Sequence, residues 1–320
     1  MRKQAFGACQ VSVIGFGTAD FGGKLPEGLA RELMDAYMAI GGNFIDTARV
    51  YGDFVTPKNG ESEKIVGRWM EDRGNRDRIF LSTKGGHPPI TSLHTSRLNP
   101  EDVRGDMAAS LEDLRTDHVE IYWLHRDDEQ QPVGRIMETL QGFLEDGTAR
   151  MTGVSNWRPE RIREANAYAA AHGLTPLAAN QPQFSLARQH FFLDHTTRGM
   201  DGETWRMHAE TGMPCCCFSS QAHAYYTRLE KGGEAALTDN LRKEFDSPAN
   251  RAVLERIRKV REETGLSVGS IALAWLTAQP FPAFPLAGAS RVEHVEALRE
   301  AGDAVLTESQ RDFLRRTDAE

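Results

Sequence analysis

The sequence predicts an α/β fold, a single (β/α)8 barrel that spans residues 1–320, and three observations support this prediction. Short β-rich runs alternate with helical patterns along almost the whole chain. Eight candidate strands separated by helices indicate a parallel sheet. No Ser/Gly/Pro-rich linker divides the chain, so one closed barrel accounts for its length better than two open domains of about 150 residues each.

Each expected strand is a short run rich in apolar and β-branched residues. The last run is accepted despite three nearby prolines, Pro280, Pro282 and Pro285. In chain order, the expected strands span residues 11–15, 43–47, 79–83, 119–124, 151–154, 177–180, 215–219 and 282–286.

Helices are expected where apolar residues recur at helical spacing or where a capping pattern begins. Leu33, Ala36, Tyr37 and Ile40 follow the i, i+3, i+4, i+7 pattern of a buried helix face. Asn99 begins a good helix start, with an Asn cap, a Pro at the first position and acidic residues in the first turn. The expected helices span 29–40, 61–71, 99–114, 132–145, 159–171, 250–263, 268–277, 292–300 and 308–316, with another beginning at 203.

One long segment, residues 221–250, has no strong pattern of its own. It is polar and contains the pair Gly232 and Gly233. Its length predicts a functional loop over the face of the barrel at which the strands end.

Charge and cysteine content exclude several classes of protein. The chain carries 38 basic and 46 acidic residues, a net charge of −8, which disfavours nucleic acid as a partner but leaves room for one local phosphate pocket. No apolar run approaches the roughly 20 residues of a membrane span, and no apolar stretch follows the basic N-terminus as in a secretory signal. Cys9 and the run 215–217 suit packing rather than cross-linking, so we expect a cytoplasmic protein. The histidines lack further ligands at metal-binding spacing, so no metal site is expected.

Four ionisable residues fall at the ends of consecutive predicted strands, where barrels of this kind place their active sites. They are Asp46 and Tyr51 after the second strand, Lys84 after the third and His125 after the fourth. A nearby ammonium lowers the pKa of a tyrosine, and a carboxylate keeps a buried lysine charged. A histidine can orient a carbonyl oxygen. Together the four residues form a device for protonating an oxyanion as it develops.

These residues and their neighbours resemble the aldo-keto reductase superfamily. The matching segments are GNFIDTARVYG at 42–52, LSTK at 81–84 and the stretch from Leu111 to His125. The resemblance covers nearly the whole chain. It implies an NAD(P)H-dependent barrel enzyme without a Rossmann domain, which reduces an aldehyde or ketone. The resemblance implies that Tyr51 donates the proton and that His125 positions the carbonyl oxygen. It also implies that Lys84 lowers the pKa of Tyr51 and that Asp46 keeps Lys84 charged.

The same resemblance implies a set of cofactor-binding residues and favours NADPH over NADH. Asp46 belongs to this set as well as to the catalytic one. The nicotinamide and its ribose are implied at Gly17, Thr18, Ala19, Ser155, Asn156, Gln181 and Phe218, the pyrophosphate at Ser219, and the adenosine 2′-phosphate at Gly288, Ser290, Arg291 and His294.

For the small-molecule carbonyl substrate we expect a pocket rimmed by five residues besides His125, with the segment 221–250 as a partial wall. The five are Phe21, Phe54, Trp123, Arg126 and Trp157. The acidic run 127–129 is either an exposed charged loop or a site that recognises a hydroxylated substrate such as a sugar, since carboxylates accept hydrogen bonds from hydroxyl groups.

Alternative functions stay open. The same residues would serve an alcohol or sugar dehydrogenase that runs the reaction in reverse. A regulatory subunit that binds the cofactor on the same barrel, like the channel β-subunits of this superfamily, is a second alternative, which the intact Asp46, Tyr51, Lys84 and His125 argue against. A Schiff-base aldolase acting through Lys84 is a third. The substrate, the direction, the stereochemistry and the oligomeric state are not determined by the sequence.

Overall fold

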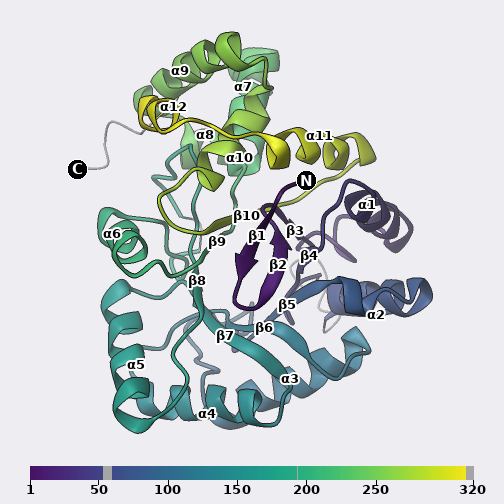
Figure 1. Cartoon of the computed structure of the whole chain (residues 1–320), viewed down its shortest axis with the longest axis vertical. Coiled ribbons are helices and arrows are strands. Elements are labelled where there is room, and N and C mark those ends of the chain that lie inside the picture. The colour runs from purple at the N-terminus through teal and green to yellow at the C-terminus, as the bar shows by residue number, and fades with distance from the viewer. Residues whose placement is uncertain (53–59, 193, 315–320) are drawn as a thin grey trace.

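A computed structural model describes residues 1–52, 60–192 and 194–314 of the chain. Within these residues, eight parallel strands close into a barrel surrounded by helices, which confirms the predicted fold class (Figure 1). In barrel order the strands are β10 (Ala283–Ala287), β3 (Gly15–Gly17), β4 (Phe44–Asp46), β5 (Phe80–Gly85), β6 (Val119–Leu124), β7 (Ala149–Ser155), β8 (Ala179–Gln181) and β9 (Cys215–Cys217).

Helices connect successive strands and pack around the outside of the barrel (Figure 1). The strand-to-strand helices are α1 (Glu27–Ala39), α2 (Glu61–Arg73), α3 (Pro100–Leu114), α4 (Val133–Glu145), α5 (Pro159–His172) and α6 (Gly202–Thr211). The longer C-terminal part adds α7 (Tyr225–Gly232), α8 (Asp239–Phe245), α9 (Pro248–Thr264), α10 (Val268–Thr277), α11 (Val292–Asp303) and α12 (Glu308–Phe313), with short 3-10 turns η1 (Arg76–Arg78), η2 (Ala222–Ala224) and η3 (Gly233–Ala236). None of the described helices is both long enough and apolar enough to cross a membrane.

The N-terminus forms a hairpin that closes one end of the barrel, and the prediction of the first barrel strand at 11–15 is wrong. Strands β1 (Lys3–Phe6) and β2 (Cys9–Ser12) pair antiparallel, and the barrel begins only at β3. The ring of Phe6 stacks on Phe80 and Phe284, at centroid distances of 5.1 and 5.0 Å. A plug over a barrel end needs apolar residues as much as a barrel strand does, so the apolar run alone could not distinguish them.

The segment 221–250 is helical, which corrects the prediction of a long loop. It consists mainly of η2, α7, η3 and α8. Tyr225, Leu241 and Phe245 are buried in an apolar cluster shared with α9 and α10. These apolar residues make the segment part of the packed helical layer on one side of the barrel, at the top of Figure 1.

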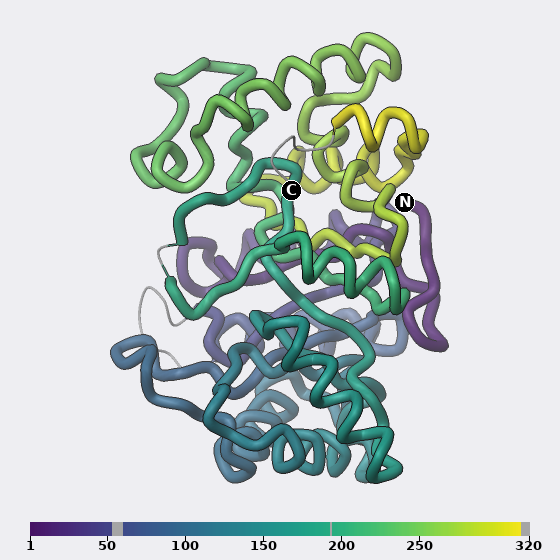
Figure 2. Tube along the Cα trace, turned by 90° about the vertical axis from the view of Figure 1, so that its left-hand side faces the viewer, coloured from purple at the N-terminus to yellow at the C-terminus, as the bar shows by residue number. Residues whose placement is uncertain are grey.

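Other segments cover the barrel end opposite the hairpin. In Figure 2 the purple hairpin lies on one side, and the connection 86–99 and the described parts of the connection after β8, residues 183–192 and 194–200, lie on the other. These two connections meet at His94 and His195, whose ring centroids are 5.1 Å apart. They surround the carboxyl ends of the strands.

Candidate active site

Inward-facing residues of the barrel strands change from apolar to polar toward the carboxyl ends. Phe44, Phe80 and Trp123 belong to one apolar cluster inside the barrel. Successive side chains on a strand alternate between its faces, so residues two or four positions further along also point inward. That alternation places Asp46, two residues after Phe44, and Lys84, four after Phe80, together above the apolar layer.

Lys84 and Asp46 form a buried ion pair at the centre of this polar layer. The Nζ of Lys84 lies 2.6 Å from Oδ2 of Asp46 and donates a second hydrogen bond of 2.7 Å to the carbonyl oxygen of Thr47. The other carboxylate oxygen of Asp46 accepts bonds from Ser82 Oγ at 2.6 Å and Gln181 Nε2 at 3.2 Å. Only 1% of the Lys84 side chain and 2% of that of Asp46 are exposed. Because the pair is fully hydrogen-bonded, both charges can persist away from water.

Tyr51 completes the cluster from a turn that follows β4. Its hydroxyl oxygen lies 3.1 Å from Nζ of Lys84, and that nitrogen is 4.5 Å from the centre of the Tyr51 ring. Burial raises the pKa of Tyr51 above its ordinary value, and the charge of Lys84 opposes this rise without cancelling it. The sequence predicts only the lowering of this pKa by Lys84. The structure adds the opposing effect of burial, so the phenol is neutral at neutral pH.

The charge of Lys84 is maintained by its partners. Burial acts to lower the pKa of Lys84, but the attraction of Asp46 and of Tyr51 outweighs this effect and the pKa is raised. The ammonium therefore stays protonated over the physiological range.

His125 lies beside Tyr51, with the two ring centroids 5.8 Å apart in an edge-to-face arrangement. Burial, assisted by the nearby His87 and the charge of Arg126, holds the pKa of His125 well below its ordinary value, so the imidazole is neutral. Its Nδ1 is buried and has no hydrogen-bond partner among the described residues. A buried lone pair without a partner is less costly than a buried N–H without one, so we assign the proton to Nε2.

Three residues predicted to hold the nicotinamide lie together at the ends of β7 and β8. Ser155 Oγ donates to the carbonyl oxygen of Gln181 at 2.7 Å, and Asn156 Nδ2 donates to the carbonyl oxygen of His125 at 3.0 Å. The side-chain amide of Gln181 makes one hydrogen bond, to Asp46, among the described residues. Its carbonyl oxygen and second N–H are therefore available, and this pairing of donor and acceptor fits a carboxamide.

The remaining predicted cofactor residues lie around the same end of the barrel. Gly17 ends β3, and Thr18, which is buried, donates from its hydroxyl to the carbonyl oxygen of Asp46 at 3.1 Å, while Ala19 is exposed. Phe218 and Ser219 are half-buried directly after β9.

The predicted phosphate-binding residues surround the N-terminus of α11. Gly288, Ser290, Arg291 and His294 are all exposed there, and Arg291 occupies the N-cap position without a side-chain cap. Arg291 forms no ion pair with the described residues. A helix N-terminus with unused N–H groups beside an arginine suits a phosphate.

Of the five residues expected around the substrate pocket, the structure brings two close to the catalytic cluster. Arg126 directly follows His125, and its guanidinium is held by Thr196 Oγ1 at 2.7 Å and Asp194 Oδ2 at 2.8 Å. Trp157 packs beside it and donates from Nε1 to the carbonyl oxygen of Arg126 at 3.2 Å.

Of the other expected rim residues, Trp123 and Phe21 are buried. Trp123 is fully buried in the apolar layer below the catalytic cluster. Phe21 is also buried, against Phe16 of the outer core. Phe54 lies outside the described residues.

Two of the three residues in the acidic run after Arg126, Asp127 and Glu129, pair with arginines. Asp127 lies 3.5 Å from Arg161, and Glu129 contacts Arg158 and Arg198 at 3.1 and 3.3 Å. These contacts give the carboxylates partners within the protein, so the structure adds no support for their use in sugar recognition.

Two residues near the site were not predicted. Ser82 binds Asp46, and its position two residues before Lys84 on the same strand could have indicated it, since both face inward. His87 packs edge-on against His125 with ring centroids 4.8 Å apart. It follows the end of β5, where strand periodicity no longer indicates direction.

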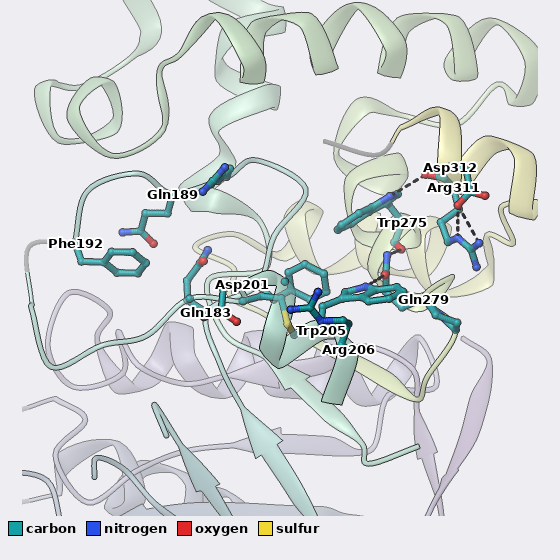
Figure 3. A pocket seen from close by; sticks show the side chains of 16 residues that line it. Gln183, Gln189, Phe192, Asp201, Trp205, Arg206, Trp275, Gln279, Arg311 and Asp312 are labelled. Carbon is teal, nitrogen blue, oxygen red and sulfur yellow. Dashed lines mark hydrogen bonds and ion pairs between the residues drawn. The ribbon is translucent and has the colours of Figure 1, made fainter. Parts of the chain in front are cut away.

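A separate cavity of about 780 Å3 lies outside the barrel, between α6, α10 and α12 (Figure 3). Its polar groups largely bind one another. Trp205 Nε1 donates to Gln279 Oε1 at 3.0 Å, Gln279 Nε2 donates to the carbonyl oxygen of Trp275, and Trp275 Nε1 donates to that of Arg311 at 3.1 Å. The predicted catalytic residues do not line this cavity, which is therefore distinct from the site described above.

Comparison with known proteins adds independent information. The model of the Aldo/keto reductase family matches residues 13–318. An "Aryl-alcohol dehydrogenase [NADP(+)]" of Phanerodontia chrysosporium is 31% identical, over 92% of this chain and 77% of that protein. A "Norsolorinic acid reductase" of Aspergillus flavus is 28% identical, over 94% and 76%. A probable aryl-alcohol dehydrogenase of Saccharomyces cerevisiae is 29% identical, over 91% and 88%.

Proposed function

The chain belongs to the aldo/keto reductase family of NAD(P)H-dependent oxidoreductases, and we propose that it catalyses the NADPH-dependent reduction of an aldehyde or ketone to an alcohol. The observation that carries this proposal is the contact of 3.1 Å between the Tyr51 hydroxyl and Nζ of Lys84, which is itself paired with Asp46. A neutral phenol beside a fixed ammonium is a proton donor whose conjugate base is stabilised where it forms.

The reaction assigns a role to each residue of the cluster. The nicotinamide, when bound, supplies a hydride to the carbonyl carbon. Tyr51 donates its hydroxyl proton to the carbonyl oxygen, and Lys84 stabilises the resulting phenolate. Asp46 keeps Lys84 charged. His125, neutral and protonated on Nε2, donates a hydrogen bond that orients the carbonyl oxygen and disperses its developing charge.

The cofactor would be held by residues at two places. Gln181 offers an amide N–H and a carbonyl oxygen to the nicotinamide carboxamide, and Phe218 offers an aromatic face to its ring. Ser155 and Asn156 offer oxygen acceptors, because their donors already bind within the protein. Arg291 and the N-terminus of α11 provide the cationic end that favours NADPH over NADH. The printed name of the Phanerodontia chrysosporium relative, which specifies NADP(+), supports the same preference.

A second candidate is oxidation of an alcohol by the same residues, with the Tyr51 phenolate as base. The names of two relatives, both aryl-alcohol dehydrogenases, favour this direction and an aromatic substrate. The proton transfer in alcohol oxidation is the reverse of that in carbonyl reduction, so the same residues serve both directions. The equilibrium of the reaction and the ratio of NADPH to NADP+ therefore determine which direction operates.

The test is a turnover assay with the purified full chain. Benzaldehydes, aliphatic aldehydes, ketones and keto-sugars are supplied with NADPH or with NADH, and benzyl alcohols with NADP+. We expect many turnovers with at least one carbonyl and a higher kcat/KM for NADPH. A protein that binds NADPH but transfers no hydride to any of these carbonyls contradicts the proposal and favours the regulatory alternative.

A further inference from the structure

The turn that carries Tyr51 is anchored by an arginine two residues before it. The guanidinium of Arg49 donates from Nη1 to Oε2 of Glu63 at 3.1 Å and also contacts the carboxylate of Asp113. Glu63 belongs to α2 and Asp113 to α3. One side chain next to the proton donor thus joins two different helices.

Glu63 extends this connection to the strand of the catalytic lysine. Its side chain is completely buried, and its second oxygen accepts a hydrogen bond from the hydroxyl of Thr83, the residue before Lys84. The backbone N–H of Arg49 donates to the carbonyl oxygen of Lys84 at 3.0 Å. The Tyr51 turn and the Lys84 strand are therefore fixed to each other through both backbone and side chains.

Gly60 provides the space for this arrangement. It has a φ of +82°, and a Cβ added to it would lie 2.1 Å from Nη1 of Arg49 and 2.9 Å from Oδ2 of Asp113. The ion pair therefore packs directly against the backbone at the start of α2. A side chain at position 60 would displace the guanidinium.

We propose that Arg49, held between Glu63 and Asp113, is a positioning residue that keeps the Tyr51 hydroxyl in contact with Lys84. The proposal rests on the proposed function, in which Tyr51 donates the proton. Both carboxylates bind one nitrogen of the guanidinium, Nη1, whose N–H directions are fixed by the plane of the group. A lysine ammonium is a flexible point charge and would hold the two carboxylates less rigidly. Loss of the clamp would let the turn shift and separate the phenol from the ammonium.

The first test replaces Arg49 with Met and with Lys. For Arg49→Met we expect kcat for carbonyl reduction to fall about ten- to a hundredfold, as a displacement near 1 Å of a reacting group does, while the Kd for NADPH stays within about twofold of the wild-type value. Arg49→Lys restores part of the rate.

The pH profile separates positioning from a general loss of folded protein. If Tyr51 moves away from Lys84, its pKa rises, so the pH at which reduction declines on the alkaline side moves upward. A smaller folded fraction would scale kcat without moving that pH. Arg73→Met, which breaks the exposed ion pair of Arg73 with Asp35 between α2 and α1, is the matched control and should leave rate and profile unchanged.

Removing Arg49 leaves the buried Glu63 without its charge partner, so that variant could unfold. Asp113→Asn keeps the Arg49–Glu63 contact and weakens only the outer half of the clamp, and we expect a smaller loss of kcat with the same direction of pH shift. A folded Asp113→Asn with the wild-type rate and profile overturns the proposal. The proposed function fails separately, if Tyr51→Phe retains turnover.

Discussion

The Nζ of Lys84 lies 3.1 Å from the hydroxyl oxygen of Tyr51, inside a cluster closed to water on the Lys84 side. Burial raises the pKa of Tyr51 and the ammonium lowers it, so the contact sets how readily the phenol gives up its proton. Two variants test the two groups separately: one removes the acid, Tyr51, and the other removes the charge of Lys84.

The first variant, Tyr51→Phe, removes the acid while keeping the ring. We expect kcat for carbonyl reduction to fall about 10²- to 10⁴-fold, the usual contribution of a general acid, with little change in the Kd for NADPH. Steady-state kinetics and a fluorescence titration of NADPH measure the two quantities. Tyr168→Phe, which removes an exposed hydroxyl bound to Glu138, is the matched control. Turnover of Tyr51→Phe near that of the control would contradict the assignment of Tyr51 as donor.

The second variant, Lys84→Met, removes the charge that opposes the raised pKa of Tyr51. The pKa of Tyr51 should rise further, because burial then acts without the opposing ammonium. Reduction needs the neutral phenol and oxidation needs the phenolate, so the pH required for alcohol oxidation should move upward and its rate at pH 8 should become much smaller. Rates of both directions measured from pH 6 to 10 check this.

Lys84→Met also leaves the carboxylate of Asp46 buried without its partner, so its free energy of unfolding must be measured beside the rates. The double variant Lys84→Met with Asp46→Asn removes both charges and serves as the control for folding. An unchanged pH profile for oxidation in a folded variant would contradict the role of Lys84.

The positions of the catalytic residues could be predicted because they obey the same alternation as the barrel core. Asp46, Lys84 and His125 each stand two or four residues after an apolar residue that fills the barrel, so strand periodicity carries them inward. The same alternation explains why Trp123 is buried below the catalytic residues. It lies two residues before His125 on the same face, and therefore one layer deeper.

What the sequence could not determine depends on contacts between distant segments. The plug formed by Phe6 requires side chains from separate strands to meet at one end of the barrel. The clamp of Arg49 with Glu63 and Asp113 similarly joins residues far apart in the chain. The local sequence pattern predicts which face of a helix or strand is buried. It does not predict which residue of another element packs against that face.

The cofactor preference can be tested at Arg291. Its exposed guanidinium at the N-terminus of α11 is expected to bind the 2′-phosphate, which NADH lacks. We expect Arg291→Ala to lower kcat/KM for NADPH about ten- to a hundredfold, the equivalent of a charged hydrogen bond of about 1.5–3 kcal/mol, and to leave that for NADH unchanged. Arg299→Ala, in the same helix and paired with Asp303, is the control. Equal losses with both cofactors would contradict this placement of the phosphate.

Asp127, two residues after His125, should make the stability of the folded protein depend on pH. Burial raises the pKa of Asp127 to about 6, although Arg161 lies 3.5 Å from it, and its Oδ2 has no hydrogen-bond partner among the described residues. The pKa of an unfolded aspartate is about 3.9. Between these two values the folded chain binds more protons than the unfolded chain, so the free energy of unfolding falls as the pH rises through this range.

The variant Asp127→Asn stays neutral and should escape this loss. A difference of about two pKa units corresponds to about 3 kcal/mol, so we expect the variant to be more stable than the wild type by up to that amount at pH 7.5 and by little or nothing near pH 4. Urea unfolding at the two pH values measures the difference. Glu145→Gln, at an exposed position that forms no ion pair with the described residues, controls for the general effect of removing a carboxylate. Equal stability changes at both pH values would contradict this prediction. They would show that the pKa of Asp127 is the same in the folded and unfolded chain, so that Arg161 stabilises the carboxylate about as much as burial destabilises it.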